Sequence, residues 1–227
     1  KLNFFKMDQN TKKQKVAEAV LDYITNGESL GIGSGSTVNV LIENLSKVKN
    51  KIRNVVSSSV NSTELLKANG FEVSELRDVG KLTKYIDGAD EVNGDLQMIK
   101  GGGGALTREK ILAHASEKFI CIVDDSKKVD ILGKFPLPIE VIPMSRSSVS
   151  LELIKHGGRP VLRENFVSDN NNLILDIHNL QIMEPIKFEQ DINNIPGVVT
   201  NGIFALDHAH MLLCANDNDV EVSEVNV

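Results

Sequence analysis

The stretch from Asp87 to Lys110, DGADEVNGDLQMIKGGGGALTREK, concentrates residue types that move protons and hold anions. Asp87 and Asp90 flank a turn at the end of an expected strand, and carboxylates placed there can accept and return protons in a cleft. Glu109 falls in the first turn of an expected helix, so its carboxylate is directed back toward the preceding loop. Three acids in so short a span predict acid–base chemistry.

Four adjacent glycines, Gly101 to Gly104, precede that helix and leave the backbone uncovered by side chains. Glycine adopts positive φ at little cost, and its N–H groups can converge on an anion. A helix start adds further free N–H groups and a positive dipole end. Lys100, immediately before the glycines, can add a full positive charge. The segment therefore predicts an anion site beside the acids.

Each of these features also has an ordinary structural explanation. Asp-Gly is a common turn pair, and Glu in a first helical turn often only complements the helix dipole. A glycine run can be a flexible link. Any one feature alone favours the structural explanation, whereas their clustering within 87–110 favours a site.

An earlier segment, SLGIGSGSTVNVLIENLSKV, has a phosphate-binding layout of strand, glycine loop and helix. We expect a buried strand over Leu30–Ile32, a tight loop over Gly33–Thr37, and a helix from Val38. The loop lacks the GK[ST] of a P-loop and the third glycine of GxGxxG. It offers hydroxyls instead, on Ser34, Ser36 and Thr37. The alternative is that Ser36 or Thr37 only caps the helix.

Strand-like and helical segments alternate through the first half of the chain, which predicts an α/β fold with a Rossmann-like, mostly parallel sheet and helices on both faces. The apolar run FICIVDD is typical of a strand covered on both faces. Ligands bind at the carboxyl ends of strands in such sheets. The polar segments that follow expected strands are Gly33–Thr37, Ser57–Ser59, Asp87–Asp90 and Asp124–Lys127. Lys127 can reach a phosphate there, although a solvated lysine is the commoner case.

Several other elements are expected along the chain. The first helix should span Thr11–Thr25, a later helix should begin at Ser62 or Thr63, and FEVSEL should form a strand. From Gly133 the proline-containing GKFPLPIEVIPM predicts a hinge into a smaller α+β domain. We expect that domain over 133–207 with a part in oligomer contacts, and the Rossmann-like core over 1–132 and 208–227.

Length and composition limit the function classes. The 227 residues carry a net charge of −6, which disfavours nucleic-acid binding. No apolar run approaches the length of a membrane span, and no signal peptide is expected. Cys121 and Cys214 lie in apolar runs and are expected to be buried thiols of a reducing cytoplasm. The origin of residues 1–6, KLNFFK, stays open.

Metal and nucleophile motifs are weak. The pair in DHAH, Asp207–His210, would place both rings on one face of a strand, but no second cluster supplies more ligands. No Ser-His-Asp or Cys-His arrangement stands out. We therefore expect no metal.

The motifs together resemble ribose-5-phosphate isomerase of type A. They are GIGSGSTV, SSSVNSTE, YIDGADEVNGDLQMIKGGGGALTREK, FICIVDDSKKVDILGKFPLPIEVIPM and IPGVVTNGIF. The resemblance runs from about Thr11 to the last strands. It implies interconversion of ribose 5-phosphate and ribulose 5-phosphate in the non-oxidative pentose phosphate pathway, without metal or cofactor, by a cytoplasmic homodimer or tetramer.

The resemblance also implies roles for individual residues. Glu109 corresponds to the catalytic base, and Asp87, Asp90 and Lys100 match the family's acidic and lysine site residues. Substrate-binding positions are Ser34, Gly35, Ser36, Thr37, Asp87, Gly88, Ala89, Asp90, Lys100, Gly101, Gly102, Gly103 and Lys127. Two departures are mild, since Ser34 stands where threonine is familiar and Gly104 where alanine is frequent.

The residue types suit an aldose–ketose isomerase that works through an enediol. Glu109 would move the proton between neighbouring carbons, and Lys100 with the glycine amides would hold the developing oxyanion. Asp87 and Asp90 are candidates for opening the sugar ring, and which is acid and which is base stays open. The hydroxyl loop and Lys127 would hold the phosphate.

Two other functions remain possible from the sequence alone. An amino-sugar phosphate isomerase-deaminase would need an acid that releases ammonia, commonly a histidine, and no histidine lies in these motifs. A non-catalytic sugar-phosphate sensor normally carries a DNA-binding segment, for which the residues before Thr11 are too few. Activity on an amino-sugar phosphate, or binding without turnover, would distinguish them.

Overall fold

The computed structural model describes residues 7–225, so the question about residues 1–6 lies outside the described residues. The chain folds into two compact units. Within the described residues, unit 1 comprises 7–88, 115–127 and 209–225, and unit 2 comprises 89–114 and 128–208. This division differs from the expected boundaries mainly at 89–114, whose short strands pair with Ile203–Phe204.

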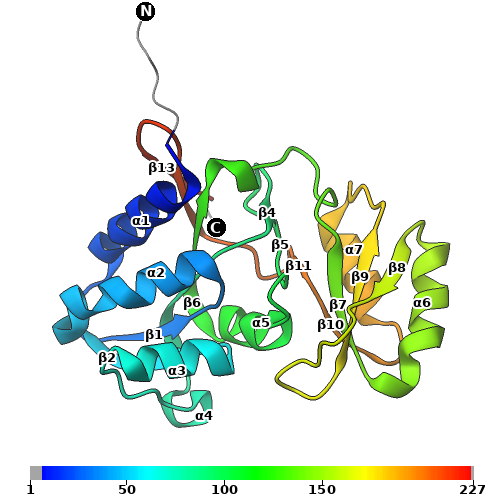
Figure 1. Cartoon of the computed structure of the whole chain (residues 1–227), viewed down its shortest axis with the longest axis horizontal. Helices are drawn as coiled ribbons and strands as arrows, with labels where there is room; N and C mark the ends of the chain where they lie inside the picture. Colours follow the sequence, from blue (N-terminus) through cyan, green and yellow to red (C-terminus); the bar gives the residue numbers. More distant parts are fainter. Residues whose placement is uncertain (1–6, 226–227) are drawn as a thin grey trace, which may run out of the picture. The chain divides into compact units, whose positions relative to one another are not determined.

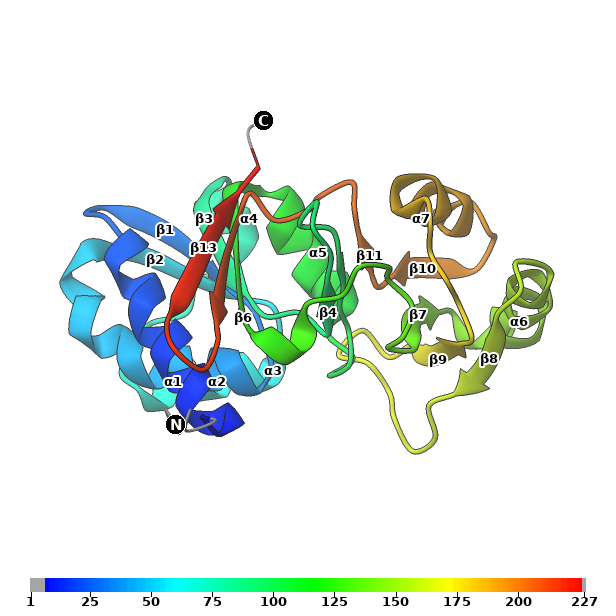
Figure 2. The same ribbon diagram turned by 90° about the horizontal axis from the view of Figure 1, so that it is seen from above.

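Unit 1 is built on a six-stranded sheet of order β13-β12-β6-β3-β1-β2 (Figure 1). All neighbours are parallel except the terminal hairpin of β12 and β13, which lies at one edge (Figure 2). The strands are β1 (Glu28–Ile32), β2 (Ile52–Ser57), β3 (Leu82–Asp87), β6 (Ser116–Asp124), β12 (Met211–Ala215) and β13 (Val220–Glu224). The expected mostly parallel sheet of an α/β protein is confirmed.

Helices flank this sheet and bury apolar residues against it. They are α1 (Gln9–Ala19), η1 (Val20–Tyr23), α2 (Ser36–Asn44), η2 (Leu45–Lys51), α3 (Val60–Ala68), α4 (Leu76–Val79) and η3 (Asp125–Lys127). Val16 and Val20 of the first helical segment pack with Leu41 of α2 and with Leu30 and Ile120 of the strands. Recurrence of apolar residues at helical spacing thus produces the core that supports the strand ends.

Unit 2 contains a four-stranded antiparallel sheet of order β10-β7-β9-β8 and a three-stranded sheet of order β11-β5-β4. The strands are β4 (Glu91–Val92), β5 (Met98–Ile99), β7 (Leu137–Val141), β8 (Arg159–Leu162), β9 (Leu173–His178), β10 (Val198–Asn201) and β11 (Ile203–Phe204). The helices are α5 (Leu106–His114), η4 (Pro143–Ser145), α6 (Arg146–Lys155) and α7 (Pro185–Asn193). Their shared core includes Ile99, Leu137 and Ile192.

Four local expectations are wrong. The proline-rich 133–144 is no hinge, because β7 pairs there with β9 and β10. FEVSEL makes only one isolated bridge at Val73 before α4. The helix after β2 begins at Val60, because the Ser59 hydroxyl caps it. The first helix tightens into the η1 turn after Ala19 and ends before Thr25.

Candidate active site

In unit 1, the phosphate-type loop and Asp87 meet where the strand order reverses. In the sheet β2 lies on one side of β1 and β3 lies on the other side. Ligands bind at the carboxyl ends of the strands at such a switch point. The Ser34 N–H donates to Asp87 Oδ1 at 3.1 Å, and Gly33 N–H donates to Ile86 O at 2.9 Å. A Cβ at Gly33 would lie 1.9 Å from Asp87 Cγ, so only glycine fits.

Asp87 is fully buried and accepts several hydrogen bonds. Besides Ser34, its donors include the Gly88 N–H at 2.7 Å and the Tyr85 hydroxyl. Hydrogen bonds from several donors fix the position of this carboxylate. Asp87 therefore organises the loop that the sequence analysis assigned to substrate.

The hydroxyl loop itself leads directly into α2. Gly35 is the N-cap residue with φ 101°, and no side chain caps the helix start. The alternative that Ser36 or Thr37 serves only as an N-cap is therefore not realised. Ser36 is exposed and Thr37 half-buried, at a helix N-terminus where backbone N–H groups favour an anion.

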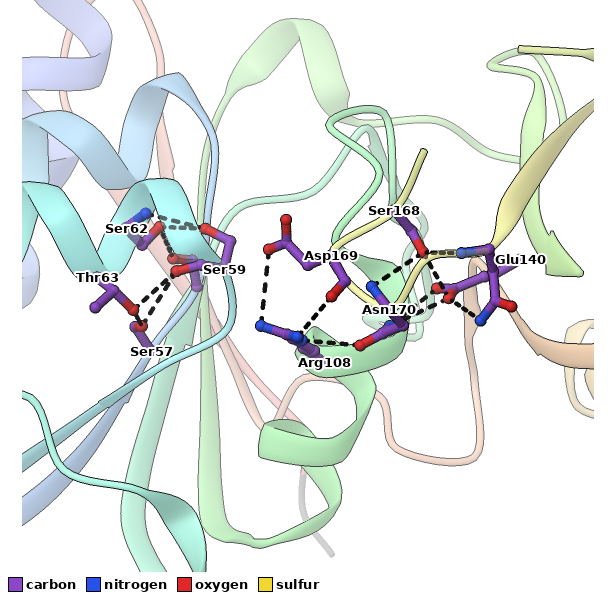
Figure 3. Close-up of polar contacts among 11 residues, drawn as sticks. Ser57, Ser59, Ser62, Thr63, Arg108, Glu140, Ser168, Asp169 and Asn170 are labelled. Carbon is purple, nitrogen blue, oxygen red and sulfur yellow. Dashed lines mark hydrogen bonds and ion pairs between the residues drawn. The ribbon is translucent and has the colours of Figure 1, made fainter. Parts of the chain in front are cut away.

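The serines after β2 support this loop. The Ser62 hydroxyl donates to Gly33 O at 2.7 Å, and Ser59 Oγ accepts from the Ser62 N–H at 3.0 Å. Ser57 and Thr63 bond to each other (Figure 3). Of these side chains, Ser62 contacts the backbone of the loop directly, and Ser59 holds Ser62 in place.

Lys127 ends the η3 turn after β6, at the same edge of the unit 1 sheet as Gly33 and Asp87. Asp124 precedes this turn and accepts from the Ser126 N–H at 3.0 Å and from Gln9 Nε2 at 3.2 Å. Burial alone would raise the pKa of Asp124, but hydrogen bonds from Ser126 and Gln9 and the charge of Lys127 outweigh it, and the pKa is lowered. The turn that carries Lys127 is thus held by an ionised carboxylate.

A second anchor of this turn comes from α1. Lys12 Nζ lies 2.8 Å from Asp125 Oδ1 and 2.8 Å from Asp217 Oδ1, with a side chain only 7% exposed. These hydrogen bonds raise the pKa of the Lys12 ammonium. The three side chains connect the turn after β6, the helix α1 and the loop between β12 and β13.

Unit 2 places Lys100 and Glu109 together. Lys100 Nζ lies 3.2 Å from Glu109 Oε2, and both side chains are almost completely buried. Glu109 is in the first turn of α5, as expected, and Lys100 follows β5. The pair places a carboxylate and an ammonium group side by side, shielded from water.

The glycines between them shape the loop next to Asp90. The Gly102 N–H donates to Asp90 Oδ2 at 2.8 Å, and a Cβ at Gly102 would lie 2.6 Å from Asp90 Oδ1. Gly101 and Gly104 have φ values of 99° and 83°. The loop therefore needs glycine for its backbone conformation and for the approach of the Asp90 carboxylate.

Helix α5 is anchored on one side through Glu140 of β7, which is fully buried. Glu140 accepts from Thr107 Oγ1 at the helix start. It also accepts from Ser168 Oγ at 2.8 Å (Figure 3). Arg108 Nε donates to Asn170 Oδ1 at 2.9 Å in the same segment (Figure 3). These contacts fix the turn of α5 that carries Glu109.

The other side of α5 is anchored by Lys110. Its Nζ donates to Glu189 Oε1 at 2.6 Å, to Asn201 O at 2.8 Å and to Ile203 O at 2.6 Å. Burial lowers the pKa of the Lys110 ammonium, although the Glu189 carboxylate opposes the change. The Lys100 N–H donates to Gly202 O at 2.9 Å. The backbone of residues 201–203 thus contacts both Lys100 and, through Lys110, the helix α5 that carries Glu109.

The predicted site residues fall into two sets. Unit 1 holds Ser34, Gly35, Ser36, Thr37, Asp87, Gly88 and Lys127, and unit 2 holds Ala89, Asp90, Lys100, Gly101, Gly102, Gly103 and Glu109. The chain passes from one set to the other between Gly88 and Ala89. Glu140, Lys110 and Glu189 were missed, because isolated charged residues in a sequence do not reveal which backbone they will contact.

His208 and His210 of DHAH do not lie on one face of a strand, which is the arrangement that a metal site at this pair would need. His208 belongs to unit 2 and His210 to unit 1, and neither lies in a strand. His210 Nδ1 accepts from the Phe119 N–H at 3.0 Å. Among residues 7–225, no group of three or more His, Cys, Asp or Glu side chains could hold a metal ion. No helix in the same residues is long and apolar enough to cross a membrane.

The mostly parallel sheet and its flanking helices define an α/β protein. The family model for ribose 5-phosphate isomerase A, also called phosphoriboisomerase A, matches residues 54–219. The chain therefore belongs to the ribose 5-phosphate isomerase A family.

Individual relatives are similar to this chain over nearly its whole length. It is 52% identical to a ribose-5-phosphate isomerase A of Haemophilus influenzae over 217 residues, which cover 95% of this chain and 99% of the relative. The crystal structure of ribose 5 phosphate isomerase A from Neisseria gonorrhoeae has a TM-score of 0.95 and 46% identity, covering 98% of this chain and all of that one. A D-ribose-5-phosphate isomerase in complex with phospho-erythronic acid has a TM-score of 0.93 at 34% identity, covering 96% and 100%.

Proposed function

We propose that this chain is an isomerase that interconverts D-ribose 5-phosphate and D-ribulose 5-phosphate through an enediol, in the non-oxidative pentose phosphate pathway. The observation that carries the proposal is the buried Lys100–Glu109 pair at 3.2 Å, in a chain 52% identical to a named ribose-5-phosphate isomerase A. A carboxylate and an ammonium in contact can move a proton and stabilise the oxyanion that results.

In the proposed reaction Glu109 is the base. It takes the proton from C2 of the open-chain aldose, and the electrons of that C–H bond form the enediolate while the C1 carbonyl oxygen becomes negative. Transfer of the O2 proton to O1, together with return of the proton from Glu109 to C1, yields the ketose. Lys100 and the glycine amides would hold the negative oxygen, and each such donor typically contributes about 3 kcal/mol to transition-state stabilisation.

Asp90 is the better candidate of the two aspartates for ring opening. Its side chain is partly exposed, and the Gly102 N–H holds one carboxylate oxygen at 2.8 Å. Asp87 is fully buried and accepts hydrogen bonds from the backbone N–H groups of Ser34 and Gly88. We therefore assign proton exchange with the ring to Asp90 and positioning of the hydroxyl loop to Asp87.

The phosphate would bind in the hydroxyl loop. Ser34, Ser36 and Thr37 offer hydroxyls at the start of α2, where the helix dipole favours an anion. Lys127 would add a positive charge from the turn after β6, which is separated from β1 by β3 in the sheet. Binding energy at this remote group would orient the sugar for proton transfer at its other end.

The assembly proposed is a cytoplasmic homodimer, with a tetramer as the alternative. Unit 2 exposes several large apolar side chains that a second copy would cover, namely Ile142, Met144, Leu151, Ile154 and Val199. Exposed apolar patches commonly mark such interfaces. Light scattering of the purified protein would give the mass, and a monomer at micromolar concentration would contradict the assembly.

The activity is tested by incubating protein treated with EDTA with ribose 5-phosphate and following ketose formation. We expect rapid conversion without added metal. Conversion only after a divalent metal is restored would overturn the metal-free mechanism. Binding without conversion in either condition would favour a sensor, and turnover of an amino-sugar phosphate with ammonia release would indicate the deaminase class.

A further inference from the structure

Arg163, which follows β8, contacts the glycine loop with its guanidinium. Its Nη1 donates to Gly101 O at 3.3 Å and to Gly102 O at 3.2 Å, and its Nη2 also donates to Gly101 O at 3.3 Å. All three residues belong to unit 2. The side chain is only 17% exposed, so this contact is largely shielded from water.

The remaining edge and one face of the guanidinium are also occupied. Nε and Nη2 donate to the two carboxylate oxygens of Asp176 at 2.9 and 2.6 Å, in the paired geometry that suits arginine. Phe166 lies against the guanidinium, with the Arg163 Cζ 5.2 Å from its ring centroid. Arg163 therefore has one orientation, set by β9 on one side and by Phe166 on another.

The contact determines which way the loop amides point. In a trans peptide the C=O and the following N–H point in opposite directions. Because Gly101 O faces Arg163, the Gly102 N–H must point away from it, and this N–H indeed donates to Asp90 Oδ2 at 2.8 Å. Because Gly102 O also faces Arg163, the Gly103 N–H is turned away from the guanidinium as well.

The backbone from Gly101 to Gly103 consists of glycines only, so it has little intrinsic preference for the conformation that turns these amides away from Arg163. Glycine loses more conformational freedom on ordering than any other residue. A charged donor that binds two successive carbonyl oxygens removes that freedom at the place where the proposed reaction needs fixed amides. Preorganised donors stabilise a developing oxyanion because they need not reorient during the reaction.

We propose that Arg163 is a positioning residue for the isomerisation, which orients the amides of Gly102 and Gly103 by holding the Gly101 and Gly102 carbonyl oxygens. The Gly102 amide in turn holds Asp90, and the Gly103 amide serves the oxyanion. Asp176 acts one step further away by holding Arg163. The inference rests on the proposed function, because the amides matter for turnover only if an oxyanion forms.

The test compares Arg163→Met and Arg163→Lys with Arg159→Met as the matched control. Arg159 is the first residue of β8, the strand that Arg163 follows, and it is exposed. We expect kcat for ribose 5-phosphate to fall about 10- to 100-fold in both Arg163 variants with KM changed less than threefold, since a misplacement near 1 Å can cost that much. Lysine should fail because a single ammonium cannot bind Asp176 and both carbonyl oxygens. Arg159→Met should keep the wild-type values.

Restoration of activity by added guanidinium distinguishes a positioning role of Arg163 from a purely structural one. Arg163→Gly leaves space for a guanidinium ion, so added guanidinium at millimolar concentration should restore part of kcat, whereas an equal concentration of sodium should not. Full activity of Arg163→Met, or a loss that tracks a lowered melting temperature and resists guanidinium, overturns the inference. An inactive wild-type protein would instead overturn the proposed function.

Discussion

The ring of Phe166 occupies the space that a side chain on Gly104 would need. A Cβ built on Gly104 would lie 2.1 Å from Phe166 Cζ, and Gly104 has a φ of 83°. Gly104 is the position at which the family resemblance led us to expect alanine. Glycine at position 104, where alanine is frequent in the family, therefore leaves room for the ring of Phe166, which also belongs to unit 2.

This relationship predicts non-additive substitutions. Gly104→Ala should lower the free energy of unfolding by roughly 2 kcal/mol or more, because it combines a positive φ with steric overlap. In Gly104→Ala/Phe166→Val the overlap is relieved, so the double variant should be more stable than the sum of the single changes by about 1 kcal/mol. Urea unfolding of the four proteins measures the coupling. Strict additivity would show that the two residues do not interact.

Glu109→Gln tests the base directly. Glutamine keeps the size of the side chain but cannot accept the substrate proton, so kcat should fall by at least about 10³-fold. Binding of the sugar phosphate should be largely retained, which calorimetry would show. Near-normal turnover would exclude Glu109 as the base. A variant that no longer binds the substrate would point to a wider loss of structure, which circular dichroism would detect.

Lys110→Met should destabilise the protein by roughly 3 kcal/mol, because it leaves the buried Glu189 carboxylate without its cation. Lys110→Met/Glu189→Gln removes that charge and should regain part of the stability. Lys187→Met is the matched control, since its pair with Asp191 is exposed and should contribute less than about 1 kcal/mol. Thermal unfolding compares all three. Equal effects of Lys110→Met and Lys187→Met would argue against a buried anchor of α5.

Asp124→Asn should change how stability depends on pH. The pKa of Asp124 is lowered in the folded protein from its ordinary value of 3.8, so the folded state favours the carboxylate. Its contribution is present above pH 3.8 and is lost as the pH falls through the lower folded value. The variant should therefore be less stable than the wild type at neutral pH, and the difference should shrink at acid pH. A difference that stays constant down to acid pH would contradict this linkage.

Local patterns in the chain were sufficient for the elements that carry the site. Glycine followed by hydroxyl residues after an apolar run predicted a loop before a helix, although α2 begins at Ser36 and not at Val38. A helical pattern after four glycines placed Glu109 in a first turn. Both depend on residues adjacent in sequence, where backbone propensity and capping decide the conformation. The apolar runs likewise predicted the parallel strands, because burial on both faces leaves a continuous apolar segment.

Only the tertiary structure decided which charged groups meet. Strand register and helix packing between distant segments bring Lys110 to Glu189 and Arg163 to Asp176. They also pair Leu137–Val141 with β9 as strand β7. The prolines of 133–144 suggested a hinge, yet β7 tolerates Pro138, whose carbonyl accepts from the Gly202 N–H at 2.7 Å. The residue types by themselves determined the chemistry available to this protein. Long-range packing determined which of those residues hold the reactive ones in place, because a contact energy exists only once the fold brings both partners together.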